Sequence, residues 1–141
     1  MTTFLLVPGA GGDPWYWHLV AARLRARGHE PMAVGLPAAD EAAGLPEYAD
    51  AVVAAGAGCR DAVLVAQSMG AYAATMACPE LDVARLVLVA PMIPAPGETP
   101  GEWWAATGQD AAERELARAR AATRMHRSTS SSSSCTTYRP R

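Results

Sequence analysis

Short apolar runs alternate with helix-like segments between Phe4 and Ala90, and this order restricts the possible folds more than any other feature of the sequence. A strand that is buried on both faces of a parallel sheet has this continuous apolar character. The four runs are Phe4–Val7, Pro31–Gly35, Ala62–Ala66 and Ala84–Ala90. The segments between them carry helix signals, of which Asp13-Pro14 at a helix start is the first. Because a strand–helix–strand order joins parallel strands by right-handed crossovers, the sequence predicts an α/β fold, a parallel sheet with flanking helices.

Composition excludes several classes of function. Half of the 141 residues are apolar, which is enough for one core, and the net charge of −2 comes from arginines and acids without lysine. This balance argues against nucleic acid as a partner and suits a small neutral molecule. The amino terminus lacks a positive region and a long apolar run, so we expect no signal peptide, no membrane association and a cytoplasmic protein. The three cysteines, widely spaced, predict reduced thiols and no metal site: Cys59, Cys78 and Cys135.

One serine lies directly between a predicted strand and a predicted helix. It is Ser68, in the stretch "VLVAQSMGAY". A serine on such a sharp turn exposes its hydroxyl above the sheet, and the turn requires small residues two positions away on both sides. Ala66 and Gly70 meet this requirement. The pattern predicts a nucleophile, although an ordinary helix-capping serine is the alternative.

A glycine-rich stretch, "PGAGG", follows the first predicted strand. A serine nucleophile needs two N–H donors for the oxyanion, one from the residue after it and one from the loop after an earlier strand. Met69 and Ala10 occupy these two places. The glycines could also begin a dinucleotide-binding loop, but Pro14 stands at its third glycine position and no acidic residue closes the second strand. A plain structural turn is a further alternative, and no cofactor is expected.

From Thr3 to about Gly108 the chain resembles the amino-terminal half of an α/β-hydrolase, within the small esterase and hydroxynitrile-lyase-like branch. The stretches that carry the resemblance are "FLLVPGAGGDPWYWHLVAARLRARGHEPMAVGLP", "VLVAQSMGAY" and "RLVLVAPMIPAPGE". The resemblance implies that Ser68 is the nucleophile, that the N–H groups of Ala10 and Met69 form the oxyanion hole, and that the substrate is a small ester. Pro8 stands where this branch has a histidine that is not a member of the catalytic triad.

The acid and histidine of a triad follow the serine in this fold. Two of the three histidines, His18 and His29, precede Ser68, and His126 lies in a segment without a preceding strand. Glu98 and Glu102 follow the last predicted strand, in a setting typical of the entrance to a cap. We therefore expect half of a site, an incomplete fold whose last strands are missing, and a chain that is inactive as given.

The predicted organisation has three parts. Residues 1–108 form the hydrolase core, residues 109–123 begin a cap helix, and residues 124–141 are a disordered tail, because their serine run cannot pack a core. A neighbouring reading frame of Cys135–Pro140 can encode Leu-His-Asp-Val-Pro-Pro, so a frameshifted or truncated terminus is our interpretation. The last predicted strand, around Leu86–Val89, should then expose an apolar edge and favour self-association.

An apolar pocket for the acyl group is expected near the serine. Its candidate lining residues are aromatic or flank the two loops: Gly9, Gly11, Trp15, Trp17, Gln67, Met92, Trp103 and Trp104. Two other functions remain open at this point. The chain could be a non-catalytic fragment or small-molecule-binding module, or it could belong to a lyase on the same scaffold, which also needs the missing histidine.

Overall fold

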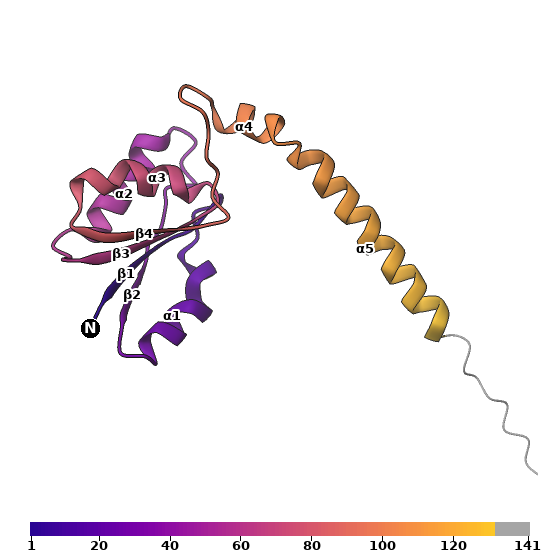
Figure 1. Ribbon diagram of the computed structural model, residues 1–141, viewed down its shortest axis with the longest axis horizontal. Coiled ribbons are helices and arrows are strands. Elements are labelled where there is room, and N and C mark those ends of the chain that lie inside the picture. Colours follow the sequence, from indigo (N-terminus) through magenta and orange to yellow (C-terminus); the bar gives the residue numbers. More distant parts are fainter. Residues whose placement is uncertain (132–141) are drawn as a thin grey trace, which may run out of the picture. The chain divides into compact units, whose positions relative to one another are not determined.

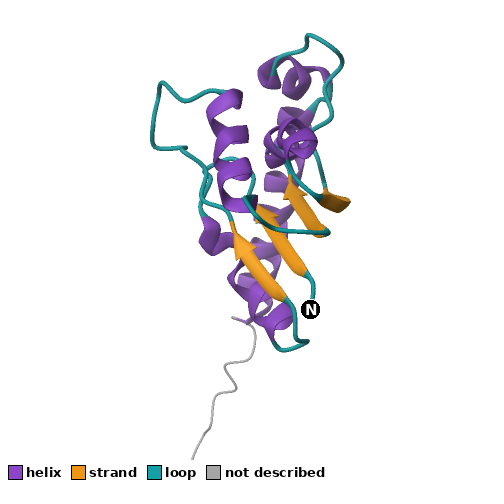
Figure 2. Ribbon diagram, turned by 90° about the vertical axis from the view of Figure 1, so that its left-hand side faces the viewer, coloured by secondary structure: helices purple, strands orange, loops and turns teal. Residues whose placement is uncertain are grey.

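Four parallel strands form one sheet in the order β2-β1-β3-β4 (Figure 1). The strands are β1 (Thr3–Val7), β2 (Glu30–Ala33), β3 (Ala62–Gln67) and β4 (Val83–Val89). Figure 2 shows strand arrows that run in the same direction. The predicted α/β fold with a parallel sheet and flanking helices is confirmed.

The computed structural model describes the backbone of residues 1–131 and the side chains of residues 1–123. Contacts divide the chain into a first unit, Met1–Pro96, and a second unit that begins at Gly97. The first unit contains the sheet together with α1 (His18–Arg25), α2 (Leu45–Gly56) and α3 (Gly70–Ala77). The second unit contains α4 (Pro100–Ala106) and α5 (Gln109–Ser131). In the described part of the chain, no helix combines the length and the apolar character needed to cross a bilayer.

Helices cover both faces of the sheet, and each face has its own core. On one face, α2 and α3 pack on alternate strand residues that include the fully buried Leu5 and Leu64. On the opposite face, α1 packs on Leu6 through Ala21. Because β1 and β3 are covered on both faces, their apolar residues are continuous rather than alternating.

The strands shift by one or two residues from the sequence-based prediction, and two helices differ from it at one end. Pro14–Trp17 forms a 3-10 turn ahead of α1, because the Asp13 carboxylate accepts a hydrogen bond from the Trp15 N–H (2.8 Å) and fixes a tight first turn. In the second unit, α5 continues beyond Thr123 to Ser131. Residues 132–141, the remainder of the predicted disordered tail, lie outside the described residues.

Candidate functional site

Ser68 lies on a strained turn between β3 and α3. Its φ is +52°, in the left-handed region that costs a residue with a Cβ about 1–2 kcal/mol. Backbone hydrogen bonds hold this conformation from both sides. The Ser68 N–H donates to the Val89 carbonyl (3.1 Å), and the Ser68 carbonyl accepts from the N–H groups of Ala71 (3.1 Å) and Met92 (3.2 Å). The side chain is half-buried at the carboxyl end of the sheet, where ligands bind in open parallel sheets.

Small residues on either side of Ser68 allow this turn. Ala66 is fully buried in β3. A Cβ added at Gly70 would overlap the carbonyl oxygen of Pro8, so the first turn of α3 lies directly against the end of β1. The spacing of small residues that predicts a nucleophile turn thus has a steric cause in the structure.

The glycine-rich loop after β1 passes next to Ser68. A Cβ added at Gly9 would lie 3.1 Å from the Ser68 Cβ and would overlap the Gln67 side-chain oxygen. Gly12 has a φ of +63°, and its carbonyl accepts from the Leu36 N–H (3.0 Å), which ties the loop to the segment after β2. Gly9 and Gln67, both expected at the pocket, are therefore neighbours of the serine.

The two predicted oxyanion donors flank this contact. Ala10 follows Gly9 in the loop, and Met69 follows Ser68 at the start of α3. Within residues 1–131, neither N–H donates to a backbone carbonyl. Ala10 is exposed and Met69 is half-buried. Both groups are therefore available to an anion at this end of the sheet, where the amino terminus of α3 adds a partial positive charge.

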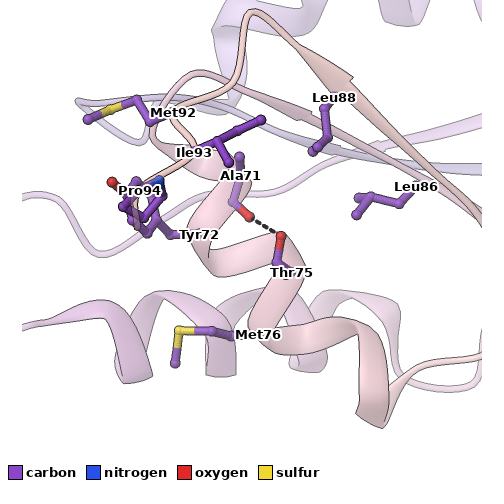
Figure 3. A pocket seen from close by; sticks show the side chains of 9 residues that line it. All are labelled: Ala71, Tyr72, Thr75, Met76, Leu86, Leu88, Met92, Ile93 and Pro94. Carbon is purple, nitrogen blue, oxygen red and sulfur yellow. Dashed lines mark hydrogen bonds between the residues drawn. The ribbon is translucent and has the colours of Figure 1, made fainter. Parts of the chain in front are cut away.

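An apolar cavity of about 480 Å³ lies beside α3 (Figure 3). Its walls come from α3, β4 and the segment after β4: Ala71, Tyr72, Thr75, Met76, Leu86, Leu88, Met92, Ile93 and Pro94. Met92 is among the pocket residues expected from the sequence. The four lining residues of α3 are not among those expected from the sequence. Their spacing (71 with 75, 72 with 76) nevertheless places them on one helix face. Ser68 does not line this cavity.

The four tryptophans expected at the pocket lie in different environments. Trp17 is 5% exposed and packs with Leu6 and Ala21, so it is a core residue. Trp15 is 69% exposed and stacks on His18 with ring centroids 4.1 Å apart. Trp103 and Trp104 lie in the second unit, where Trp104 Nε1 donates to Asp110 (2.7 Å). Gly11, with a φ of +91°, has open space around it in the loop beside Ala10.

Neither histidine whose side chain is described contacts Ser68. The His18 ring nitrogen Nδ1 lies 2.8 Å from the Trp15 carbonyl within the same local turn. His29 packs edge-on against Phe4, at the amino end of the strands, and Ser68 lies at their carboxyl end. His126 lies outside the residues whose side chains are described. Within that part of the chain, no group of three or more His, Cys, Asp or Glu side chains could hold a metal ion.

Glu102 has a structural role in the second unit. The Thr99 N–H and hydroxyl donate to its Oε2 (2.8 and 2.7 Å), and the Glu102 N–H donates back to the Thr99 hydroxyl, which forms a capping box at α4. These bonds, first from the backbone and then from the side chain of Thr99, lower the pKa of Glu102. A carboxylate that caps its own helix is a weak candidate for a catalytic acid.

We expect Thr99→Ala to raise the pKa of Glu102, because the variant loses the hydroxyl that stabilises the charged form. The pKa of Glu102 is lower in the folded chain than in the unfolded one. This cap therefore stabilises α4 fully at pH values above the unfolded-state pKa. Its contribution falls as the pH drops through the folded pKa. Carbon-detected NMR titration of the Glu102 carboxyl measures the pKa in both chains. Equal midpoints would refute the role of the hydroxyl.

Comparison with known proteins gives consistent matches. The model of the alpha/beta hydrolase family matches residues 4–139. A probable esterase of rice (Oryza sativa subsp. indica), PIR7A, is 38% identical over 111 residues, which cover 70% of this chain and 42% of that protein. The chain thus spans about two fifths of the length of the curated relatives that it matches.

Solved structures share the fold. The crystal structure of polyneuridine aldehyde esterase matches with a TM-score of 0.62 at 24% identity, over 78% of this chain and 48% of that one. Tomato methylketone synthase I, in complex with 2-tridecanone, matches with a TM-score of 0.62 at 22% identity, over 77% and 46% of the two chains.

Proposed function

Because the chain belongs to the alpha/beta hydrolase family, we propose that Ser68 is the nucleophile of an ester-hydrolysing site and that the N–H groups of Ala10 and Met69 bind the oxyanion. The observation that carries this proposal is the φ of +52° at Ser68. A residue with a Cβ keeps a strained backbone conformation only where surrounding contacts hold it in place. Such residues concentrate at active sites. The three backbone hydrogen bonds of Ser68 hold its backbone in this conformation.

The chemistry follows from this arrangement. The Ser68 hydroxyl oxygen attacks the ester carbonyl carbon, its proton passes to a base, and the carbonyl oxygen becomes an oxyanion beside Ala10 and Met69. Collapse of this intermediate, with the proton passing from the base to the leaving oxygen, expels the alcohol and leaves an acyl group on Ser68. Water then hydrolyses this group to the carboxylic acid and restores the Ser68 hydroxyl. Each well-placed oxyanion donor contributes about 2.7–4 kcal/mol in comparable sites.

We infer that neither of the two described histidines, His18 and His29, is the proton acceptor of this site. A serine hydroxyl without a base is a poor nucleophile at neutral pH. His18 contacts the Trp15 carbonyl, His29 packs against Phe4 at the other end of the strands, and Glu102 caps α4. We therefore infer that this chain alone turns over esters very slowly, while it carries the nucleophile and oxyanion half of the site. The esterase names of the rice relatives support a small-molecule ester as the substrate class.

A Ser68→Cys variant tests the site without the missing base. A free thiol has a pKa of about 8.5, far closer to neutral pH than that of a serine hydroxyl, and a position at a helix amino terminus lowers it. We expect p-nitrophenyl acetate to acetylate the introduced thiol at least about tenfold faster than Cys59 and Cys78, because each pKa unit changes the thiolate fraction about tenfold. Burial raises the pKa of the Cys78 thiol, which makes it the slower internal reference.

Site-resolved mass spectrometry of the acetylated thiols gives the rates of the introduced thiol, Cys59 and Cys78 in one sample and separates them from that of Cys135. Iodoacetamide, which forms no oxyanion, serves as the control reagent. A preference for the introduced thiol that is larger with the ester than with iodoacetamide supports the oxyanion donors. Acetylation of the introduced thiol at the rate of Cys59 would contradict the proposal.

A further inference from the structure

Gly9, in the glycine-rich loop after β1, packs directly against Gln67, the residue before Ser68. Val7 of β1 pairs with Ala66 of β3, so the residues that follow each strand lie side by side. A Cβ at Gly9 would overlap the side-chain oxygen of Gln67 and would lie 3.2 Å from its carbonyl oxygen. The backbone and the side chain of Gln67 thus both approach the same side of Gly9.

This close approach, and not the backbone conformation, is what requires a small residue at position 9. Gly11 and Gly12 have φ values of +91° and +63°, in the region that favours glycine, whereas Gly9 has no positive φ. Alanine could therefore adopt the backbone conformation of Gly9. The atoms that oppose an added methyl group belong to Gln67 and Ser68.

A second contact anchors the other end of the glycine-rich loop. The Gly12 carbonyl accepts a hydrogen bond from the Leu36 N–H (3.0 Å). Ala10, which lies between the two anchored ends, is exposed to solvent. Its N–H belongs to the peptide unit that joins it to Gly9, so the packing of Gly9 on Gln67 determines where this N–H lies.

We propose that Gln67 is a positioning residue of the ester-hydrolysing site. Its side chain holds Gly9 in place and so keeps the Ala10 N–H beside Ser68, a role that rests on the function proposed above for Ala10 and Ser68. Gln67 acts through Gly9 and contacts no reacting atom in this role. An oxyanion donor must lie within hydrogen-bond distance of the oxygen, and a displacement of about 1 Å can lower a rate about 100-fold.

Acylation of an introduced thiol tests this role in the full chain. In the Ser68→Cys background, the rate with p-nitrophenyl acetate divided by the rate with iodoacetamide reports on the oxyanion donors, because only the ester forms an oxyanion. We expect Gln67→Ala to lower this ratio at least about fivefold, a part of the 10²–10³-fold that removal of a whole donor costs. A change in stability alone would affect both reagents alike. Gln109→Ala, in α5 of the second unit, is the matched control and should leave the ratio unchanged.

A substitution at Gly9 tests the contact itself. Gly9→Ala should lower the ratio, because the new methyl group collides with the Gln67 side chain and displaces the loop. In the double variant with Gln67→Ala, the methyl group occupies the space of the amide oxygen. The ratio should then return to within about threefold of that of the Ser68→Cys chain, whereas independent effects would multiply.

Nitrogen-15 relaxation of the Ala10 amide measures the order of the loop without any reaction. Gln67→Ala should lower its order parameter from the value of about 0.85 that is typical of rigid backbone, and Gln109→Ala should not. Circular dichroism should show that each variant is folded.

The outcomes separate this proposal from the function on which it rests. An unchanged ratio in Gln67→Ala, or losses that multiply in the double variant, would overturn the positioning role and leave Ser68 as the proposed nucleophile. A lower ratio with an unchanged order parameter would contradict positioning through the loop. If the Ser68→Cys chain itself shows no preference for the ester, the proposed function and the role of Gln67 are both wrong.

Discussion

A chimera that joins residues 1–96 of this chain to the carboxyl-terminal remainder of the rice esterase is expected to hydrolyse p-nitrophenyl acetate about 10⁴-fold faster, or more, than this chain alone. The reason is that a nucleophile, base and acid act as a unit, so a site without its base loses most of the rate that the triad provides. The junction after Pro96 follows the boundary of the first unit, and the rice protein is 38% identical to this chain over the aligned residues.

The control for this experiment is Ser68→Ala in the chimera, which should return turnover to the level of this chain alone. The rice segment contributes no part of the Ser68 turn, so activity that survives this substitution would place the nucleophile elsewhere. A folded chimera without turnover would show that the Ser68 turn is not competent.

Gly70→Ala is expected to destabilise the first unit by about 1–3 kcal/mol, the usual effect of forcing an extra methyl group into a packed site. The added Cβ would overlap the Pro8 carbonyl oxygen, and backbone cannot yield as a flexible side chain can. A loss of this size is a large part of the marginal stability of a small domain. Urea unfolding followed by circular dichroism measures it.

Gly101→Ala is the matched control, because Gly101 also lies near the start of a helix, α4, and has open space where its Cβ would be. Alanine is the better helix former, so this variant should be neutral or slightly more stable. Equal stability of the two variants would mean that α3 does not depend on close approach to the end of β1.

The arrangement of the sheet could be predicted from the sequence because its two central strands, β1 and β3, are buried on both faces. Continuous apolar runs ending in Pro8-Gly9 and in Gln67-Ser68 mark the strands and their carboxyl ends, and topology then brings those ends together. This is why the sequence predicts that the glycine-rich loop lies next to Ser68. The roles of Ala10, Met69 and Ser68 in catalysis remain predictions.

Other features depend on contacts that no local pattern encodes. Trp17 and Trp15 are two positions apart in a tryptophan-rich stretch, yet Trp17 packs on Leu6 and Ala21 in the core and Trp15 is exposed and stacks on His18. The anchoring of Ser68 by Val89 and Met92 uses backbone groups only, so it leaves no trace in side-chain identity. The sequence pattern underestimates the length of α5 because serine is a poor helix signal.

The most direct test of Ser68 as the nucleophile is the position of a covalent adduct. After treatment of the chimera with a fluorophosphonate, peptide mapping by mass spectrometry should find the phosphonyl group on Ser68, formed far faster than in this chain alone. The serine run of residues 130–134 provides competing hydroxyls in this chain as internal controls. An adduct on any other serine, or equal labelling after Ser68→Ala, would contradict the assignment.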